Sequence, residues 1–400
     1  MGIDARNMAL IGHNDLGGQG DGMHVNVVDG HAFVGHQGHS AIGTSVVDVS
    51  DPENPRLVAQ IARPPGTHSH KLQIVGDVMA VNHERNRFES TPAARWSAGL
   101  AVYDISDPSD PKQIGFFETP GTGVHRMTYW EEPHAFLSAS AEGFLGRILL
   151  VVDLSDPSQP REVGRWWFPG QNQAAGETLT WTPPAQDRPG PGEKQVIMHH
   201  GLPDGDRLYC GWWDGGLVIL DISDLEQPKL VSHLEFGEES SETHTALPVP
   251  GRNLLVVTDE AVTRKLGLQK HVRIVDISNE SDPEVIAKFP VPSYDYHERG
   301  IRYGPHNLHE HRPGSLLDPN TAYLTYFAGG IRAYDISDAR APREIAHLVP
   351  EVPPRLPDSP PSAQGAAQFN DVTVDAQGLI YVTDRFGGGL YIVEHERSAA

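Results

Sequence analysis

Histidine is the residue type with the widest chemical scope in this chain, which has 21 histidines among its 400 residues. Neutral imidazole binds iron, copper, zinc and nickel, and it titrates near neutral pH. Six histidines stand at or near the same place in a repeated sequence unit, and two of them have a second histidine close by. The six are His24, His68, His125, His200, His244 and His306, and the neighbours are His70 and His199.

Carboxylates recur after three of these histidines, at the ends of apolar stretches. The sequences are Asn82-His83-Glu84, Ser140-Ala141-Glu142 and Thr258-Asp259-Glu260. A carboxylate that accepts the outer N–H of a ligating imidazole fixes its tautomer and raises its basicity. We therefore expect Glu84 and Glu260 to act as acid/base residues or as partners of metal-bound histidines. A solvated acidic rim is the alternative interpretation.

Other common catalytic arrangements are missing from the sequence. Cys210 is the single cysteine, so the chain has no intrachain disulfide and no thiolate cluster for zinc or iron–sulfur. We find no nucleophile elbow, phosphate-binding glycine loop or dinucleotide fingerprint. The histidines favour a metal site, and a water-filled channel lined by polar side chains is the alternative.

A recurring phrase supplies the elements that would position these side chains. An alternating apolar strand ends at Asp-Ile-Ser or a variant of it, as in VVDLSDPSQPREVG from Val151. The Asp and Ser side chains can bond to the backbone of the turn, and the prolines that follow are tolerated only at a sheet edge. The phrase recurs about every 50 to 70 residues, a period typical of four-stranded propeller blades. The aspartates that close the strands are Asp48, Asp104, Asp153, Asp221, Asp276 and Asp335.

A seventh, weaker copy predicts how the ring closes. Tyr391-Ile392-Val393-Glu394 has no outer strand after it, whereas residues 7–11 precede the first unit and have no repeat of their own. Pairing these two segments would remove two exposed sheet edges. We therefore predict one all-β domain over residues 1–400, a seven-bladed β-propeller closed by an N-terminal strand. The first strand of each blade would bring the six histidines to the central channel.

The phrase resembles the repeat of the LVIVD-repeat β-propeller family, which is named for a valine- and isoleucine-rich strand ending in Asp. This resemblance covers nearly the whole chain and implies the fold, but it implies little about chemistry, because propellers have many functions. There is a looser similarity to selenium-binding-protein/methanethiol-oxidase propellers and to carotenoid-cleavage oxygenases. Both carry histidine-bound metals on the propeller axis, which implies the same for this chain.

These observations together predict a metal-dependent enzyme. Three or four of the six histidines would hold a divalent transition metal, iron before copper, and leave coordination sites open for substrate or dioxygen. We expect an oxidoreductase or oxygenase that acts on a small molecule, for which an aromatic compound is one option. Metal-assisted hydrolysis or lyase chemistry is one alternative, and a non-enzymatic scaffold for protein partners is another. The aromatic residues on or beside the long loops of the histidine face are Trp96, Trp181, Trp212, Trp213, Tyr294, Tyr296 and Phe386.

The charge of the chain favours a small-molecule partner. The formal net charge is −22, which repels nucleic-acid phosphates and anionic lipid. No stretch reaches the roughly 18 apolar residues of a membrane span, and the first residues lack the apolar core of a signal peptide. We expect a cytoplasmic protein that binds neither nucleic acid nor membrane.

Overall fold

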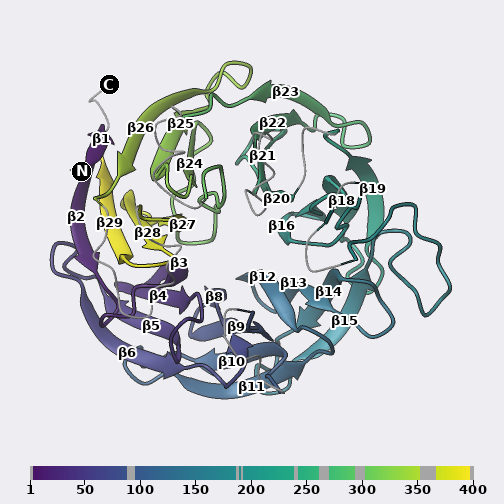
Figure 1. Ribbon diagram of the computed structural model, residues 1–400, viewed down its shortest axis with the longest axis horizontal. Helices are drawn as coiled ribbons and strands as arrows, with labels where there is room; N and C mark the ends of the chain where they lie inside the picture. The colour runs from purple at the N-terminus through teal and green to yellow at the C-terminus, as the bar shows by residue number, and fades with distance from the viewer. Residues whose placement is uncertain are drawn as a thin grey trace.

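The computed structural model describes residues 3–87, 95–185, 189–190, 192–237, 242–260, 270–292, 302–351 and 366–396. Over these ranges the chain is all-β, and its strands form seven antiparallel sheets arranged as the blades of a ring (Figure 1). This arrangement confirms the predicted seven-bladed β-propeller. Among the described residues, no helix is long and apolar enough to cross a membrane.

The first five blades follow one another along the chain, and the strands of each blade run in order from the axis outward. Blade 1 contains β3 (Gly22–Val28), β4 (His31–His36), β5 (Ile42–Asp48) and β6 (Arg56–Ala62). Blade 2 contains β7 (Thr67–His68), β8 (Leu72–Val75), β9 (Val78–Arg85), β10 (Gly99–Asp104) and β11 (Lys112–Glu118). Blade 3 contains β12 (Val124–Glu131), β13 (His134–Ser140), β14 (Arg147–Asp153) and β15 (Arg161–Trp166). Blade 4 contains β16 (His200–Asp204), β17 (Arg207–Gly211), β18 (Leu217–Asp221) and β19 (Lys229–Leu234). Blade 5 contains β20 (Thr243–Pro248), β21 (Leu254–Asp259), β22 (Val272–Asp276) and β23 (Glu284–Lys288).

The last two blades share the N-terminal segment. Blade 6 contains β24 (Thr321–Thr325), β25 (Ile331–Asp335) and β26 (Arg343–Val349), and β1 (Asp4–Arg6) pairs with the outer edge of β26. On the axial side of β24 the segment around Leu308 forms a single bridge to Leu324. Blade 7 contains β27 (Phe369–Val374), β28 (Leu379–Asp384), β29 (Gly389–His395) and, outermost, β2 (Met8–Asn14).

The pairing of β2 with β29 closes the ring. Leu10 lies opposite Val393 in an antiparallel register, as the orphan N-terminal segment predicted. The two ends of the described chain consequently lie near each other on one side of the ring (Figure 1). The short strand β1 was not predicted, because its residues Asp-Ala-Arg carry no apolar alternation.

The repeated aspartates stabilise the turns between the third and fourth strands. Asp335 Oδ1 accepts hydrogen bonds from the backbone N and the Oγ of Ser337, at 2.9 and 2.6 Å. The hydrogen bonds from Ser337, and secondarily the one from Arg343, lower the pKa of Asp335 to about 2. The same bond, from the backbone N of the serine two residues on, forms at Asp48, Asp104, Asp153, Asp221 and Asp276.

Neighbouring blades interlock at one small residue on each outer strand. A Cβ added to Gly164 of β15 would lie 1.9 Å from the carbonyl oxygen of Leu225, in the aspartate turn of the next blade, and Gly115 faces Pro157 in the same way at 2.0 Å. The turn of one blade therefore occupies the space that a side chain would need. In the described outer strands the residue at this register shift is always small: Gly12, Ala59, Gly115, Gly164, Ser232, Ala287 and Ala346.

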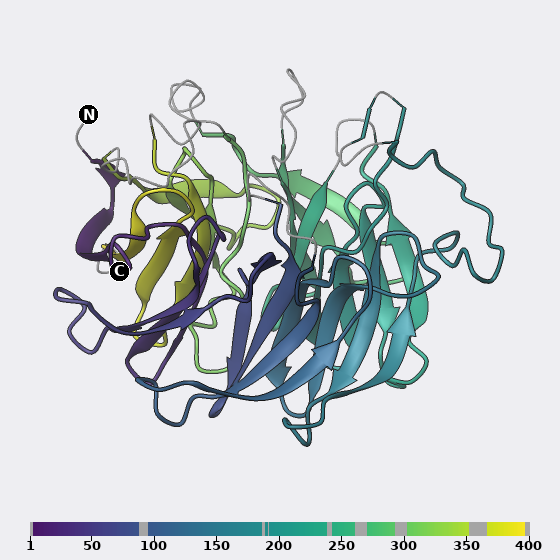
Figure 2. The same cartoon turned by 60° about the horizontal axis from the view of Figure 1, so that its bottom comes forward.

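Figure 2 shows the blades standing side by side around the ring. The core lies between them, where apolar faces of adjacent sheets meet. Leu100 and Val102 of β10, for example, form one buried cluster with Leu137 and Leu150 of blade 3. Both faces of most sheets are covered, so the middle strands are apolar almost throughout, as in β14. This packing fixes the inner strands that carry the histidines.

Candidate metal centre in the axial pocket

An irregularity in the inner strands decides which side chains enter the axial pocket. A β-bulge leaves His125 of β12 and His244 of β20 without a cross-strand partner. β3 and β27 carry the same bulge at Met23 and Asn370. A bulge departs from the usual alternation of side chains and redirects the extra residue. His125 and His244 accordingly line the pocket, and the residues that follow them face elsewhere.

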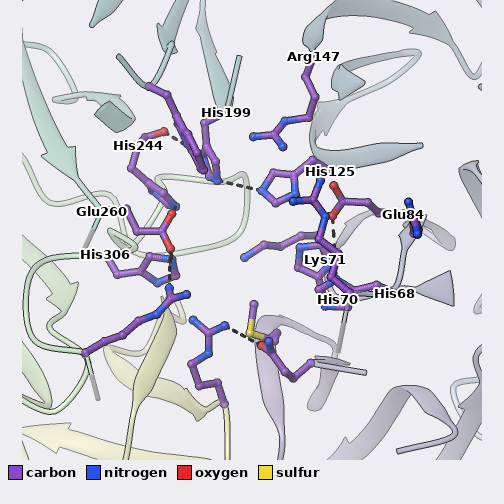
Figure 3. A pocket seen from close by; sticks show the side chains of 17 residues that line it. His68, His70, Lys71, Glu84, His125, Arg147, His199, His244, Glu260 and His306 are labelled. Carbon is purple, nitrogen blue, oxygen red and sulfur yellow. Dashed lines mark hydrogen bonds and ion pairs between the residues drawn. The ribbon is translucent and has the colours of Figure 1, made fainter. Parts of the chain in front are cut away.

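The pocket has a volume of about 160 Å³, and its walls come from the inner strands of several blades (Figure 3). Four of the predicted histidines line it, but His24 and His200 do not. His70 and His199, which lie close to His68 and His200 in the sequence, line it as well. The histidines in the wall are His68, His70, His125, His199, His244 and His306.

His24 and His200 belong to a second polar layer next to the pocket. Nε2 of His200 lies 3.5 Å from Oε1 of Glu310, and Nε2 of His24 lies 3.6 Å from Oδ2 of Asp371. Arg126 donates to Glu310 at 2.5 Å within the same buried layer. His24 follows the bulged residue Met23, and Arg126 follows the bulged residue His125. In each strand the bulged residue therefore faces the axial pocket, and the next residue faces the second layer. The predicted common ring of six histidines is therefore two layers.

His125 and His199 face one another through nitrogen atoms that both carry a lone pair. Nδ1 of His125 donates to Oε2 of Glu84 at 2.9 Å, and Nδ1 of His199 donates to the carbonyl oxygen of His244 at 3.1 Å. In the neutral imidazoles the protons are thus on Nδ1, and the two Nε2 atoms, 3.2 Å apart, are both acceptors. Burial lowers the pKa of both histidines, which favours the neutral forms. Two facing lone pairs at this distance can both bind one cation.

His244 and His306 continue this arc of imidazoles. The ring centroid of His199 is 3.8 Å from that of His244, which is 4.6 Å from that of His306. Nδ1 of His306 donates to the carbonyl of Asn370 at 2.6 Å, and Nε2 of His244 is buried without a hydrogen bond. Both Nε2 atoms lie near Glu260, at 3.7 Å for His244 and 3.5 Å for His306. The ligand atoms of His199, His244 and Glu260 all lie within 4.8 Å of one another.

His68, His70 and Glu84 form a second buried group of this size. The rings of His68 and His70 are stacked, with centroids 3.7 Å apart. Asn82 Oδ1 accepts from the backbone N of Lys71, so the Asn82 amide nitrogen faces Nδ1 of His70, at 3.2 Å. That contact places the His70 proton on Nε2, where it blocks ligation. The arc from His125 to His306 is therefore better arranged to bind a metal ion than the group of His68, His70 and Glu84.

Glu84 and Glu260 lie where the sequence predicted, one strand outward from the histidines. Burial alone would raise the pKa of Glu84, but His125 outweighs it and brings the value to about 2. Glu84 is therefore a carboxylate that accepts from His125. Glu260 also accepts from Arg302 at 3.0 Å. Glu142, the third glutamate of the row, does not line the axial pocket but a separate depression with Glu118 and Glu162.

Two aromatic residues support the pocket from left-handed backbone conformations. Trp213 has φ 43° and stacks on His199, and Phe327 has φ 45° and packs against His306. Such conformations are costly for bulky residues and often mark functional sites. Trp212 instead packs between blades against Trp166, the alternative that its position left open. Tyr294 and Tyr296 lie outside the described residues.

The fold and the site together define a β-propeller with a histidine-lined axial pocket, and comparisons with known proteins agree on the fold. The LVIVD-repeat model matches residues 19–62, 93–119, 145–166, 204–235 and 268–289. The chain therefore carries LVIVD repeats, as its recurring phrase indicated. The copies that end at Asp335 and Glu394 lie outside the matched segments.

The similar solved structures show the fold and no more. The RRP9 WD40 repeats align with 98% of this chain and 99% of their own, at 10% identity and a TM-score of 0.61. The U3-55K structure aligns with 97% of this chain and 98% of its own, at 10% identity and a TM-score of 0.60. No curated protein matches the chain.

Proposed function

We propose that the chain is a metal-dependent enzyme whose axial pocket holds one divalent transition metal ion. The observation that carries this proposal is the contact between Nε2 of His125 and Nε2 of His199 at 3.2 Å, in which both nitrogens are acceptors. Two nitrogens bound to one tetrahedral ion at about 2.0–2.1 Å are roughly 3.3 Å apart. His244 and His306 offer further nitrogens in the same arc, so the donor set fits an ion that prefers imidazole.

The carboxylates around this arc suit the role of outer partners. Glu84 orients His125 through the Nδ1–H bond and raises its basicity as a ligand. The carbonyls of His244 and Asn370 do the same for His199 and His306. Glu260 stands beside two of the imidazoles and is held by Arg302, so it can orient ligands or move a proton.

Iron is the favoured ion and oxidative chemistry the favoured reaction. The looser resemblance to carotenoid-cleavage oxygenases rests on imidazoles that are hydrogen-bonded to carboxylates. A centre of two histidines and one carboxylate is typical of non-haem iron oxygenases. The group of His199, His244 and Glu260 would have that composition with Glu260 bound to the ion directly instead of serving as an outer partner. The ion would supply dioxygen activation, while the residues of the chain bind and orient the substrate. Copper is the next candidate.

Metal-assisted hydrolysis is the second candidate, and one specific observation favours it. The pocket carries a second group of metal-ligand residues, His68, His70 and Glu84, beside the first. Pairs of metal ions are common in hydrolases that act on esters and phosphates. The tautomer of His70 argues against a second ion, so we rank this function below oxidation.

Metal analysis of protein purified without a histidine tag tests the proposal. We expect about one transition-metal ion per chain and its loss in His199→Gln. Reconstitution with Fe²⁺, Cu²⁺ or Zn²⁺, followed by measurement of dioxygen consumption with small organic substrates, separates oxidative from hydrolytic function. A chain that takes up none of the three ions with a Kd below about 10 µM would contradict the proposal.

A further inference from the structure

The walls of the axial pocket carry an excess of positive charge in a strongly acidic protein. The net charge of the chain is −22. The acidic residues that line the pocket are Glu84 and Glu260, whereas the basic ones are Lys71, Arg85, Arg87, Arg147, Arg302 and Arg385. A concave site lined by one sign of charge attracts ligands of the opposite sign.

Two of these arginines differ from the other buried arginines in having no carboxylate partner. Arg126, Arg273, Arg312 and Arg332 are equally buried, and each forms an ion pair with Asp or Glu. Among the described residues, neither Arg147 nor Arg385 forms an ion pair. Buried charges are normally paired, because removing them from water is costly.

The hydrogen bonds of Arg147 and Arg385 leave donor atoms unused. Nε of Arg147 donates to the carbonyl of Met198 at 3.1 Å, and Arg385 donates to Oε1 of Gln37 at 3.0 Å. Nη2 of Arg147 and Nε of Arg385 are buried and have no hydrogen-bond acceptor in the structure. Burial lowers the pKa of Arg147 to about 10, although the carboxylates of Glu84 and Glu260 act in the opposite direction.

Two cations of the pocket, Arg147 and Lys71, lie beside the candidate metal centre. Figure 3 shows Arg147 entering the pocket beside His125, and Lys71 extending from the side of His70 and His68 into its middle. Lys71 is 3% exposed and makes no hydrogen bond through Nζ with any described residue. An anion held by these groups would lie next to the imidazoles of the arc.

We propose that the substrate of the axial pocket is a small carboxylate whose anionic group binds to Arg147, with Lys71 beside it and Arg385 adding to the positive charge of the wall. The proposal rests on the proposed function, because it names the substrate class of the same site. Guanidinium groups bind carboxylates through charge-assisted hydrogen bonds. A cavity of about 150 Å³ holds a benzene molecule, so the volume of about 160 Å³ fits a ligand the size of benzoate.

Calorimetric titration with benzoate and its neutral isostere benzamide tests the proposal. We expect benzoate to bind at least tenfold more tightly than benzamide, both to the metal-free and to the metal-loaded protein. Arg147→Gln should weaken benzoate binding about tenfold or more, Arg385→Gln should weaken it less, and both should leave benzamide binding unchanged. Arg56→Gln, at the exposed start of β6, is the matched control and should bind benzoate as the native protein does.

The possible results separate this inference from the proposed function. Equal binding of benzoate and benzamide, no binding of either, or unchanged benzoate affinity in both arginine variants would overturn the inference. Arg147→Lys keeps the charge and should retain part of the affinity, and the thermal midpoint of each variant verifies its fold. If metal binds but benzoate does not, only the inference fails. If benzoate binds through the arginines but no metal is taken up, only the proposed function fails.

Discussion

His125 and His199 come from adjacent blades and approach each other through Nε2 atoms 3.2 Å apart, with both Nδ1 protons committed to acceptors. Without an ion this contact sets two lone pairs against each other, and with an ion it becomes a pair of ligands. Substitution of either residue should therefore weaken metal binding. We expect His125→Gln and His199→Gln each to weaken metal binding by at least 100-fold, more than the loss of an outer partner causes.

Metal titration of the two variants measures this effect. His31→Gln is the matched control, because His31 lies in blade 1 and bonds only to the backbone carbonyl of Asp29. Native metal affinity in either pocket variant would exclude that residue as a ligand.

Glu84 should act on metal binding only through the orientation and basicity of its histidine. Glu84→Gln replaces the carboxylate that accepts from Nδ1 of His125 by a weaker acceptor. We expect metal affinity to fall roughly 10–100-fold while the thermal midpoint changes little. Glu142→Gln is the matched control, since Glu142 lies outside the axial pocket. Equal metal affinity in the two variants would assign Glu84 to a merely structural role.

The small residues of the outer strands should tolerate almost no enlargement. Gly164→Val places a branched side chain where the carbonyl oxygen of Leu225 already lies, 1.9 Å from the site of the new Cβ. Overpacking of this kind costs about 1–3 kcal/mol or more of unfolding free energy. Urea denaturation measures the loss, and Ala59→Gly at the equivalent position of blade 1 should cost about 1 kcal/mol at most. Similar stability of both variants would show that the blades can shift apart freely.

The aspartate turns should make the propeller sensitive to strong acid. The folded state lowers the pKa of Asp48, chiefly through Ser50, to about 2 from the usual 3.8, and lowers that of Asp335 in the same way. A lowered folded pKa means stability that is present above pH 4 and is lost as the pH falls toward 2. Asp335→Asn should reduce the unfolding free energy at pH 6. At pH 2 the difference in unfolding free energy between this variant and the native protein should be smaller. Denaturation curves at both pH values measure this, and a gap that widens in acid would contradict the explanation.

The sequence predicted the fold well because each blade repeats the same local signals. The apolar strand, the Asp-x-Ser turn and the edge proline recur, and the single unmatched strand at residues 7–11 has only one place to pair. The positions of Glu84 and Glu260 near the ends of the second strands were predictable for the same reason, since β9 and β21 follow the repeated pattern, whereas their acid/base role stays a prediction.

The choice among adjacent histidines could not be made from the sequence, because it depends on bulges and on where a strand begins. β16 begins at His200, so His199 lies just before it, and an alignment cannot tell which of the two enters the pocket. In blade 1 the bulge falls on Met23, so His24 turns to the second layer. The unpaired state of Arg147 was equally hidden, since it appears only when the partners of every buried arginine are known.

The closure between β2 and β29 also affects how the protein is made. β2 precedes blade 1 in the chain, whereas β29 follows blade 6, so β2 has no partner strand until the rest of blade 7 has been synthesised. Pairing between such distant segments is slow, and unpaired strand edges promote aggregation. The nascent chain thus depends on early blades that fold before blade 7 is complete, and on protection of its open edges until β29 pairs with β2.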